Sequence, residues 1–358
     1  MPKSKIVNIV IFGVGKVGST LINQINRAKP IVLELENITI NIPVITNSQI
    51  ALYSSTSVSH SWKSDFESFT IPYKIEDIIR YTKLKKLDNL IAVDATASSE
   101  FVNHYRSLIE NGFDIVSANK KANTLPIEFY IDLREKLKKH NKRFLYETNV
   151  GAGLPVIETI RNLHRSGDDI HKIRGVFSGT LSYIFNTFSS SDLSFSKVIN
   201  EASRLGLTEP DVRVDLSGQD VGRKLLILAR ELGLQLNLEE VEIESLVPSY
   251  LNGNTTIQEF NKRKKELNKP FESLKEKAGH NKVLRYVAEL KVADRSLEVK
   301  LIEEDKNSAI GRLKGSNSLF EVYSSTYNDE PLIIQGAGAG KEVTARGLIS
   351  DILRIANT

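Results

Sequence analysis

The sequence predicts a two-domain α/β protein, with an open parallel sheet in the first domain and a mixed α/β arrangement in the second. A buried strand pattern, Lys5–Phe12, runs directly into a glycine-rich turn and a helical pattern. Further strand patterns alternate with helical segments through the first 150 residues. Later in the chain, two neighbouring strand patterns are typical of an antiparallel hairpin. We therefore expect domains at residues 1–150 and 151–330, and a strand and helix in 331–358 that return to the first domain.

The composition suits an intracellular enzyme and argues against several other classes of protein. The chain has 358 residues, enough for two domains, and its 48 basic and 44 acidic residues leave a net charge of +4. That balance gives no reason to expect a nucleic-acid or membrane partner. The absence of cysteine excludes disulfides and thiolate chemistry. No apolar stretch reaches the roughly 20 residues of a membrane span, so we expect a cytoplasmic protein.

The turn after the first strand carries the Gly-x-Gly-x-x-Gly pattern of a Rossmann-type dinucleotide-binding domain. Its first glycine permits the tight turn, the second lets the backbone approach a pyrophosphate, and the third lets the helix pack closely on the strand. The helix N-terminus then faces the phosphates. Because the pattern lies between a buried strand and an amphipathic helix, we interpret it as a dinucleotide site. The predicted cofactor contacts here are Gly13, Val14, Gly15, Lys16, Val17 and Gly18.

The second strand is predicted at Asn41–Ile45, after an extra loop at Lys29–Asn41, and it ends in Thr46–Ser48. The acidic residue that usually binds the ribose hydroxyls at this point is missing. Side chains of these types bind either a hydroxyl or a 2′-phosphate, so both NAD and NADP are open. His60 and Lys63 downstream either supply positive charge for the phosphate or face solvent.

Two later strands bring polar residues to the carboxyl edge of the predicted sheet, where open parallel sheets bind ligands. Leu90–Asp94 is followed by Thr96 and Ala97, and Asp114–Ser117 is followed by Lys120. Its place at this edge makes Lys120 a candidate for the chemistry, although paired lysines in loops are often simply solvated.

The strand predicted at Arg143–Glu147 ends in a glycine-rich turn, Thr148–Pro155, that leaves the first domain. Backbone carbonyls of this turn, together with Glu147, can coordinate a hard cation. A plain crossing between domains is the equally open alternative.

A loop and helix at residues 206–224 bring together the carboxylates of Glu209, Asp215 and Asp220 and the amine of Lys224. The helix pattern predicts Asp215, or the serine two residues later, as N-cap. Asp220 and Lys224 then lie one turn apart on one face. An isolated pair of this kind is usually an exposed ion pair. Glu209 and Asp215 in the preceding loop favour a site instead, because acidic groups aimed at one place suit a ligand with an ammonium group.

The second half of the chain has a different order of predicted strands and helices. Lys282–Val292 and Arg295–Ile302 predict a hairpin. The charged segment Asn252–His280 is predicted to be a mostly helical, solvated excursion, because its acidic and basic residues interleave. In the tail, a strand at Pro331–Gln335 leads through a glycine turn to a helix at Val343–Ile355.

Five motifs spread along the chain are specific in combination. They are Ala118–Ala122, Asn149–Pro155, Phe177–Asn186, Gly206–Lys224 and Ile334–Gly340. Together they resemble homoserine dehydrogenase, in particular its short, monofunctional, fungal type. The resemblance runs from the first strand to the terminal helix. One departure is Asp211-Val212, where the family commonly has Asp-Pro. Because the glutamate, the two aspartates and the lysine are in register, we expect altered loop stiffness there and an intact site.

The resemblance implies interconversion of L-homoserine and L-aspartate 4-semialdehyde with NAD(P), a step toward threonine, methionine and isoleucine. Oxidising the alcohol needs a hydride acceptor and a group that takes the hydroxyl proton. Lys224 is the first candidate for that group and Lys120 the second. One alternative is another two-domain amino-acid oxidoreductase, which would not explain the motifs of the second half. The other is a nucleotide-sensing protein without turnover, against which both lysines argue.

The resemblance also implies the remaining roles. The substrate residues are Glu209, Asp215, Asp220, Thr180 and Gly179. The cofactor residues beyond the glycine motif are Thr96, Ala97, Lys120, Gly206 and Gly340. A sodium ion is held by Glu147, Val150, Ala152 and Leu154, three of them through backbone carbonyls. The family analogy favours a homodimer formed through the second domain.

Overall fold

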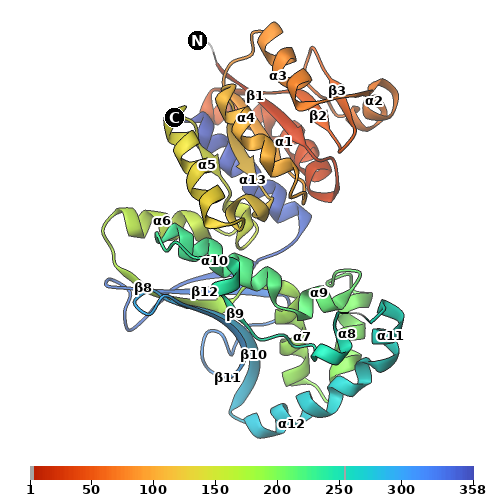
Figure 1. The fold of residues 1–358 in the computed structure, drawn as a ribbon, viewed down its shortest axis with the longest axis vertical. Coiled ribbons are helices and arrows are strands. Elements are labelled where there is room, and N and C mark those ends of the chain that lie inside the picture. The colour runs from red at the N-terminus through yellow and green to blue at the C-terminus, as the bar shows by residue number, and fades with distance from the viewer. Residues whose placement is uncertain (1–3, 254) are drawn as a thin grey trace. The chain divides into compact units, whose positions relative to one another are not determined.

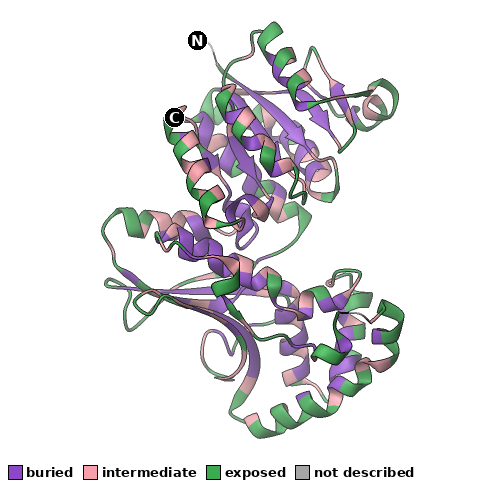
Figure 2. Cartoon of the chain, in the orientation of Figure 1, coloured by how far each residue is buried: buried purple, intermediate pink, exposed green. Residues whose placement is uncertain are grey.

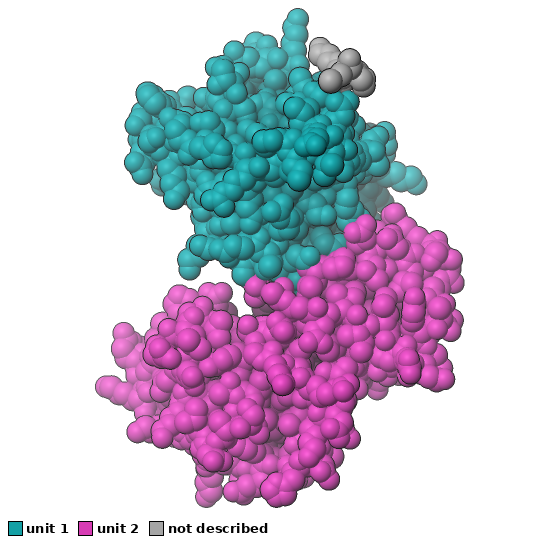
Figure 3. Space-filling view, turned by 180° about the vertical axis from the view of Figure 1, so that it is seen from behind, with its two compact units in different colours: residues 1–153, 340–358 teal, residues 154–339 magenta. Residues whose placement is uncertain are grey.

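The computed structural model describes residues 4–253 and 255–358, and the chain forms two compact units (Figures 1 and 3). Unit 1 consists of Met1–Gly153 and Gly340–Thr358, and unit 2 of Leu154–Ala339. Each unit has its own sheet. The predicted fold class, a Rossmann-type domain with a mixed α/β domain, is therefore confirmed. None of the helices among the described residues is long and apolar enough to cross a membrane.

Unit 1 holds a seven-stranded sheet with the order β4-β3-β2-β1-β5-β6-β7. The strands are β1 (Lys5–Phe12), β2 (Ile38–Thr46), β3 (Ile50–Tyr53), β4 (Ile71–Pro72), β5 (Leu90–Asp94), β6 (Asp114–Ser117) and β7 (Phe144–Leu145). The helices are α1 (Lys16–Glu36), α2 (Trp62–Phe69), α3 (Ile75–Leu84), α4 (Tyr105–Glu110), α5 (Ile127–Lys139) and α13 (Lys341–Ala356). Short 3₁₀ turns are η1 (Phe101–His104), η2 (Lys120–Asn123) and η3 (Glu147–Asn149). β1, β2, β5, β6 and β7 are parallel, whereas β3 pairs antiparallel with β2, and β4 pairs antiparallel with β3.

The core of unit 1 forms because β1 is apolar on both faces, as a strand covered on both sides must be. Ile9 and Ile11 belong to the core that α1 and α13 complete through residues such as Leu21 and Leu348. Phe12 points to the opposite face, and its ring centre lies 4.6 Å from that of Phe101 in η1. β5 is accordingly buried along its whole length, and β1 is buried from Val7 to Phe12 (Figure 2).

One prediction for unit 1 is wrong. The extra loop expected at Lys29–Asn41 does not form, because α1 continues through Pro30 to Glu36 and β2 begins at Ile38. Ala28 and Val32, on either side of the proline, are buried in the core of this unit. The free energy gained by burying these two side chains offsets the loss of the backbone hydrogen bond that a proline inside a helix removes.

Unit 2 holds a six-stranded sheet with the order β13-β12-β8-β10-β11-β9. The strands are β8 (Ile170–Val176), β9 (Glu242–Ile243), β10 (Lys282–Lys291), β11 (Ser296–Asp305), β12 (Asn317–Ser324) and β13 (Leu332–Ala337). The helices are α6 (Val156–Arg165), α7 (Gly179–Ser190), α8 (Phe195–Arg204), α9 (Val212–Leu216), α10 (Gln219–Glu231), α11 (Ile257–Arg263) and α12 (Asn268–Ala278). The 3₁₀ turns are η4 (Leu238–Glu240), η5 (Ser249–Leu251) and η6 (Lys264–Leu267).

The predicted hairpin is confirmed, because β10 and β11 pair antiparallel with Lys291 opposite Ser296. The mostly helical excursion at Asn252–His280 is confirmed as well, as α11, η6 and α12. The tail differs from its prediction: only α13 belongs to unit 1, whereas β13 pairs antiparallel with β12 in the sheet of unit 2. The short connection between β12 and β13 favours a hairpin, which keeps the strand beside its neighbour in the chain.

Two glycines of the first turn offer a test of this packing. A Cβ atom at Gly18 would lie 1.8 Å from the carbonyl oxygen of Gly13, whereas a Cβ at Gly15 would meet no atom within 4 Å. We expect Gly18→Ala to lower the free energy of unfolding by about 1–3 kcal/mol, the usual cost of overpacking. Gly15→Ala is the matched control and should leave it nearly unchanged. Thermal or denaturant unfolding of both variants makes the comparison, and equal losses would contradict it.

Candidate active site

Lys224 is the centre of the polar cluster in unit 2. Its side chain is only 9% exposed, yet its ammonium group donates to the carbonyl oxygen of Phe177 at 2.8 Å and pairs with Asp220 at 2.9 Å. Phe177 directly follows β8, and Asp220 lies one turn earlier in α10. A buried ammonium group needs such partners, because desolvation otherwise disfavours its charge. The pair expected at helical spacing is therefore present, with the lysine end buried and the aspartate end half exposed.

The start of α10 fixes the position of this lysine. The helix begins at Gln219 after Gly218, whose φ of 72° lies in the left-handed region. A Cβ at Gly218 would lie 2.1 Å from the hydroxyl oxygen of Tyr286, so both the backbone shape and the space require glycine. The predicted N-cap, Asp215 or the serine after it, is wrong: both fall in or directly after the separate short helix α9, which ends at Leu216.

Asp215 links the acidic loop to the start of α7. Its carboxylate accepts a hydrogen bond from the backbone amide of Glu209 at 2.8 Å. Burial raises the pKa of Asp215, the hydrogen bonds from the Glu209 amide and from Thr180 lower it, and the charges of Glu209 and Asp220 raise it again. The predicted carboxylates therefore interact electrostatically in one place, beside Thr180. A cation placed among them would relieve their mutual repulsion.

The first turn of α7 contributes two of the predicted residues. Ser178 caps the helix by accepting from the backbone amide of Leu181, and Gly179 and Thr180 follow it. A Cβ at Gly179 would lie 2.9 Å from the carbonyl oxygen of Ser316, so the chain passes too closely for a side chain there. The single hydroxyl proton of Thr180 is shared between two acceptors, Asp215 and the carbonyl of Leu207, and the second contact ties α7 to the acidic loop.

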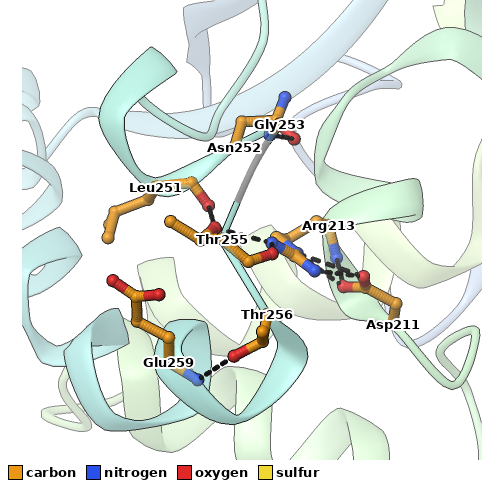
Figure 4. Close-up of polar contacts among 8 residues, drawn as sticks. All are labelled: Asp211, Arg213, Leu251, Asn252, Gly253, Thr255, Thr256 and Glu259. Carbon is orange, nitrogen blue, oxygen red and sulfur yellow. Dashed lines mark hydrogen bonds and ion pairs between the residues drawn. The ribbon is translucent and has the colours of Figure 1, made fainter.

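Sequence reasoning missed the support of this loop, which Figure 4 shows. Arg213 is buried and binds Asp211 through Nε and Nη2, the latter at 2.6 Å. Its Nη1 donates to both the carbonyl and the hydroxyl oxygen of Thr255 at 2.8 Å. The aspartate also caps α9 by accepting from the backbone amide of Arg213. The only local signal in the sequence was an Asp-x-Arg pair, and Thr255 lies too far along the chain for a motif to include it.

In unit 1 the glycine turn has the expected shape. Gly13 has a φ of 97°, and its amide donates to the carbonyl of Thr46 at 2.8 Å, which joins the ends of β1 and β2. Gly15 is the N-cap of α1 and has open space beside its Cα atom. An open helix N-terminus next to a glycine is suited to a phosphate group.

A cavity of about 570 Å³ lies at the carboxyl ends of β1, β2 and β5. Thr46, Asn47 and Ser48 line it, as do Thr96 and Ala97. Its remaining charged or aromatic neighbours are Phe12, Tyr73, Lys74, Glu76, Glu100, Phe101 and His104. The cavity is large enough for part of a dinucleotide.

Two candidate cations do not line this cavity. His60 is exposed, and Lys63 on α2 places its ammonium nitrogen 5.9 Å from the ring centre of Trp62. Lys74 and His104 line it instead, contributed by the segments before α3 and in η1. Sequence reasoning missed them because neither adjoins a glycine motif.

Lys120 begins η2, directly after β6 and Asn119. Asn119 caps this turn, its side-chain oxygen accepting from the backbone amide of Lys121 at 3.1 Å. The other cofactor candidates divide between the units: Gly340 is the N-cap of α13 in unit 1, and Gly206 lies after α8 in unit 2 with a φ of 70°.

The glycine-rich turn after η3 has an unusual backbone. Gly151 and Ala152 both have positive φ, 79° and 54°, and the latter is costly for a residue with a side chain. Glu147 is buried; its amide donates to Asp351 at 2.9 Å, and its carboxylate lies 3.7 Å from Arg354. Within residues 4–253 and 255–358, no group of three or more His, Cys, Asp or Glu side chains is placed to hold a metal.

Comparisons with known proteins agree along the chain. The family model for homoserine dehydrogenase matches residues 155–353, and the model for its NAD-binding domain matches residues 13–147. The homoserine dehydrogenase of Saccharomyces cerevisiae is 36% identical over 363 residues, covering 99% of each chain. The bifunctional aspartokinase/homoserine dehydrogenase of Haemophilus influenzae is 39% identical over 98% of this chain. The chain spans 43% of the length of that relative.

Solved structures give the same assignment of fold. A crystal structure of a protein of unknown function from Candida auris has a TM-score of 0.90 and 35% identity over 99% of both chains. A hyperthermophilic archaeal homoserine dehydrogenase, solved in complex with NADPH, has a TM-score of 0.74 over 98% of this chain. At 21% identity it supports the fold alone. From the two family models and the full-length similarity to the yeast enzyme, the chain belongs to the homoserine dehydrogenase family of NAD(P)-dependent oxidoreductases.

Proposed function

We propose that this protein interconverts L-homoserine and L-aspartate 4-semialdehyde, with NAD(P) as the hydride carrier. The observation that carries this proposal is the buried ammonium group of Lys224, held by Phe177 and Asp220 beside the acidic residues Glu209 and Asp215. This arrangement offers one proton-carrying group and a cluster of negative charge. An amino acid with a reacting hydroxyl or aldehyde group needs both.

When bound, the nicotinamide supplies the hydride acceptor for oxidation of the alcohol and the hydride donor for reduction of the aldehyde. The chain supplies the proton transfer. In reduction, Lys224 donates a proton to the carbonyl oxygen as that oxygen gains charge. In oxidation, the neutral lysine takes the proton of the hydroxyl group. Lys120, on the carboxyl edge of unit 1, is the second candidate for this transfer.

The acidic residues hold the amino group of the substrate. Glu209 is exposed, so its carboxylate is accessible to a ligand, while its backbone is fixed by the hydrogen bond to Asp215. The substrate ammonium group lowers the electrostatic cost of placing Asp215 and Asp220 near that carboxylate. Thr180 and Gly179 form the neighbouring wall at the start of α7.

For the cofactor, the residues present fit the pyrophosphate and the adenosine side. The open space at Gly15 and the helix N-terminus suit the pyrophosphate, and the cavity beside Thr46–Ser48 suits the ribose. The loops that carry Thr96 and Lys120 lie at the carboxyl edge of the same sheet. Gly206 and Gly340 complete the cofactor residues of this proposal.

Three further assignments are part of the proposal. Glu147, Val150, Ala152 and Leu154 hold a sodium ion, an idea supported by the irregular backbone of the turn, in which Gly151 and Ala152 have positive φ. The protein forms a homodimer through unit 2, where β13 is an edge strand with Ile333 exposed. Its location is the cytoplasm, consistent with the balanced charge and the lack of cysteine.

The direct test of the activity is absorbance at the nicotinamide band, with L-homoserine and each of NAD and NADP in turn. Growth of the reduced-nicotinamide band with L-homoserine supports the proposal. Cofactor binding without turnover would favour a nucleotide sensor, and turnover with other amino alcohols only would favour another amino-acid oxidoreductase.

Removal of the lysine tests its role in proton transfer. We expect Lys224→Ala to lower kcat by about two to four orders of magnitude, the range for loss of a general acid or base, without changing the Kd for NADPH. Lys197, an exposed lysine on α8, is the matched control, and Lys197→Ala should keep normal kcat. Near-normal kcat in Lys224→Ala would remove Lys224 from the mechanism.

Removal of the exposed carboxylate tests substrate binding. We expect Glu209→Ala to raise KM for L-homoserine by about tenfold with little change in kcat, because an ammonium contact stabilises the ground state and the transition state alike. Steady-state kinetics measures both constants, with Glu239→Ala in η4 as an exposed-glutamate control. An unchanged KM with a collapsed kcat would assign Glu209 to the chemical step.

The missing acidic residue after β2 predicts the cofactor preference. We expect both cofactors to work, with NADP favoured modestly and the preference shrinking as salt rises, because exposed charges are screened. Lys74→Ala should reduce the preference, whereas Lys63→Ala, which does not touch the cavity, should not. Titrations of NAD and NADP at low and high ionic strength check this. A strong preference for NAD that is independent of salt would contradict it.

A further inference from the structure

Asp94 is a buried carboxylate at the end of β5 that the proton-transfer scheme above does not use. The residue is 1% exposed. Its Oδ1 accepts from the backbone amide of Thr96 at 2.8 Å. Its Oδ2 accepts from the hydroxyl of Tyr105 at 2.7 Å and from the side-chain amide of Asn119 at 2.9 Å. One side chain therefore gathers a loop, a helix and a cap from three separate parts of unit 1.

Asn119 extends this network to the second cofactor loop. Its side-chain nitrogen also donates to the carbonyl of Ser98 at 2.8 Å, and its oxygen accepts from the amide of Lys121. The two loops joined in this way are residues 95–98 and 118–121. They carry Thr96 and Lys120, which are residues of the proposed cofactor site.

The hydrogen bonds around Asp94 require a side chain that only accepts hydrogen bonds, as an ionised carboxylate does. The groups that hydrogen-bond Asp94 are all donors, namely the amide and the side chain of Thr96, the hydroxyl of Tyr105 and the side-chain amide of Asn119, and no ion pair with a lysine, arginine or histidine compensates its charge within the described residues. Burial raises the pKa of Asp94, and the hydrogen bonds from Thr96, Tyr105 and Asn119 lower it. A buried carboxylate without a cation is costly, whereas an asparagine in its place would turn an amide donor toward one of these donors.

We propose that Asp94 is the positioning residue of the cofactor site: its carboxylate holds the Thr96 and Lys120 loops in the conformation that binds NAD(P). Asp94 itself does not contact the cofactor in this scheme. The protein binds the cofactor more tightly because the two loops are ordered before binding. Less conformational entropy is then lost when the cofactor binds. The inference rests on the cofactor part of the proposed function and does not depend on the identity of the substrate.

Asn8 offers a matched control in the same sheet. It is also buried, its side-chain nitrogen donates to the carbonyl of Asp88, and its oxygen accepts from Asn41, both at 2.6 Å. It lies opposite Leu90, at the start of β5, whereas Asp94 ends that strand. Asn8→Ala should therefore weaken unit 1 without touching either loop.

The experiment compares Asp94→Asn with Asn8→Ala in the full-length protein. Fluorescence titration gives the Kd for NADPH, and thermal unfolding gives Tm. We expect both variants to lower Tm, but only Asp94→Asn to raise the Kd for NADPH, by at least tenfold. Its KM for L-homoserine at saturating NADP should stay within about threefold of the wild-type value. A role in stability alone would not produce this split between the two ligands.

A second variant keeps the inference testable if Asp94→Asn does not fold. Asn119→Ala leaves the donors of Thr96 and Tyr105 on the carboxylate but disconnects it from the Lys120 turn, and it should raise the Kd for NADPH at least fivefold. The inference is overturned if Asp94→Asn, or Asn119→Ala in its place, keeps a Kd within twofold of that of Asn8→Ala. Wild-type protein that binds NADPH but does not oxidise L-homoserine would contradict the proposed function alone, because the Kd comparison needs no turnover.

Discussion

The proposed catalytic site depends on the burial of one ammonium group. The ammonium group of Lys224 is buried, donates a hydrogen bond to the Phe177 carbonyl and pairs with Asp220, and such contacts offset the cost of taking a charge out of water. To reach that carbonyl, α10 must pack closely on the sheet of unit 2. The glycines at its start make this possible: a Cβ at Gly222 would lie 2.4 Å from the side chain of Ile243. The position of the Lys224 ammonium nitrogen is therefore set by the start of α10, by the spacing of the glycines in that helix and by the end of β8.

The carboxylates near Lys224 favour a substrate that carries an amino group. Asp215 is half-buried, and its raised pKa reflects burial first and the neighbouring carboxylates of Glu209 and Asp220 afterwards. Asp211 does not add to this repulsion, because Arg213 neutralises it and the same contact lowers its pKa. The loop is therefore supported by one ion pair and a link to Thr255, and the carboxylates of Glu209 and Asp215 carry its remaining negative charge. We infer that the amino group of the substrate compensates this charge.

Sequence patterns that span a few residues predicted the parts of the molecule whose shape depends on neighbouring residues in the chain. The turn at Gly13 and Gly18 follows from a positive φ and a close approach, which only glycine satisfies. Lys224 and Asp220 meet because helical spacing brings them together. The path of α1 through Pro30 was not predictable in this way, because it depends on burial of both flanks against a core formed by distant strands. The pairing of β13, the contact of Arg213 with Thr255 and the donors around Asp94 likewise join residues far apart in the sequence.

A double-mutant cycle on kcat tests most directly whether Lys224 and Asp220 act as one unit. It requires Lys224→Ala, Asp220→Asn and the double variant, each with saturating L-homoserine and NADP. If Asp220 acts by holding the lysine in place, the double variant should be no more than about threefold slower than Lys224→Ala alone, because the aspartate then has nothing left to hold. Losses that multiply would show that the two residues act independently, and would contradict the buried ion pair as the centre of the site.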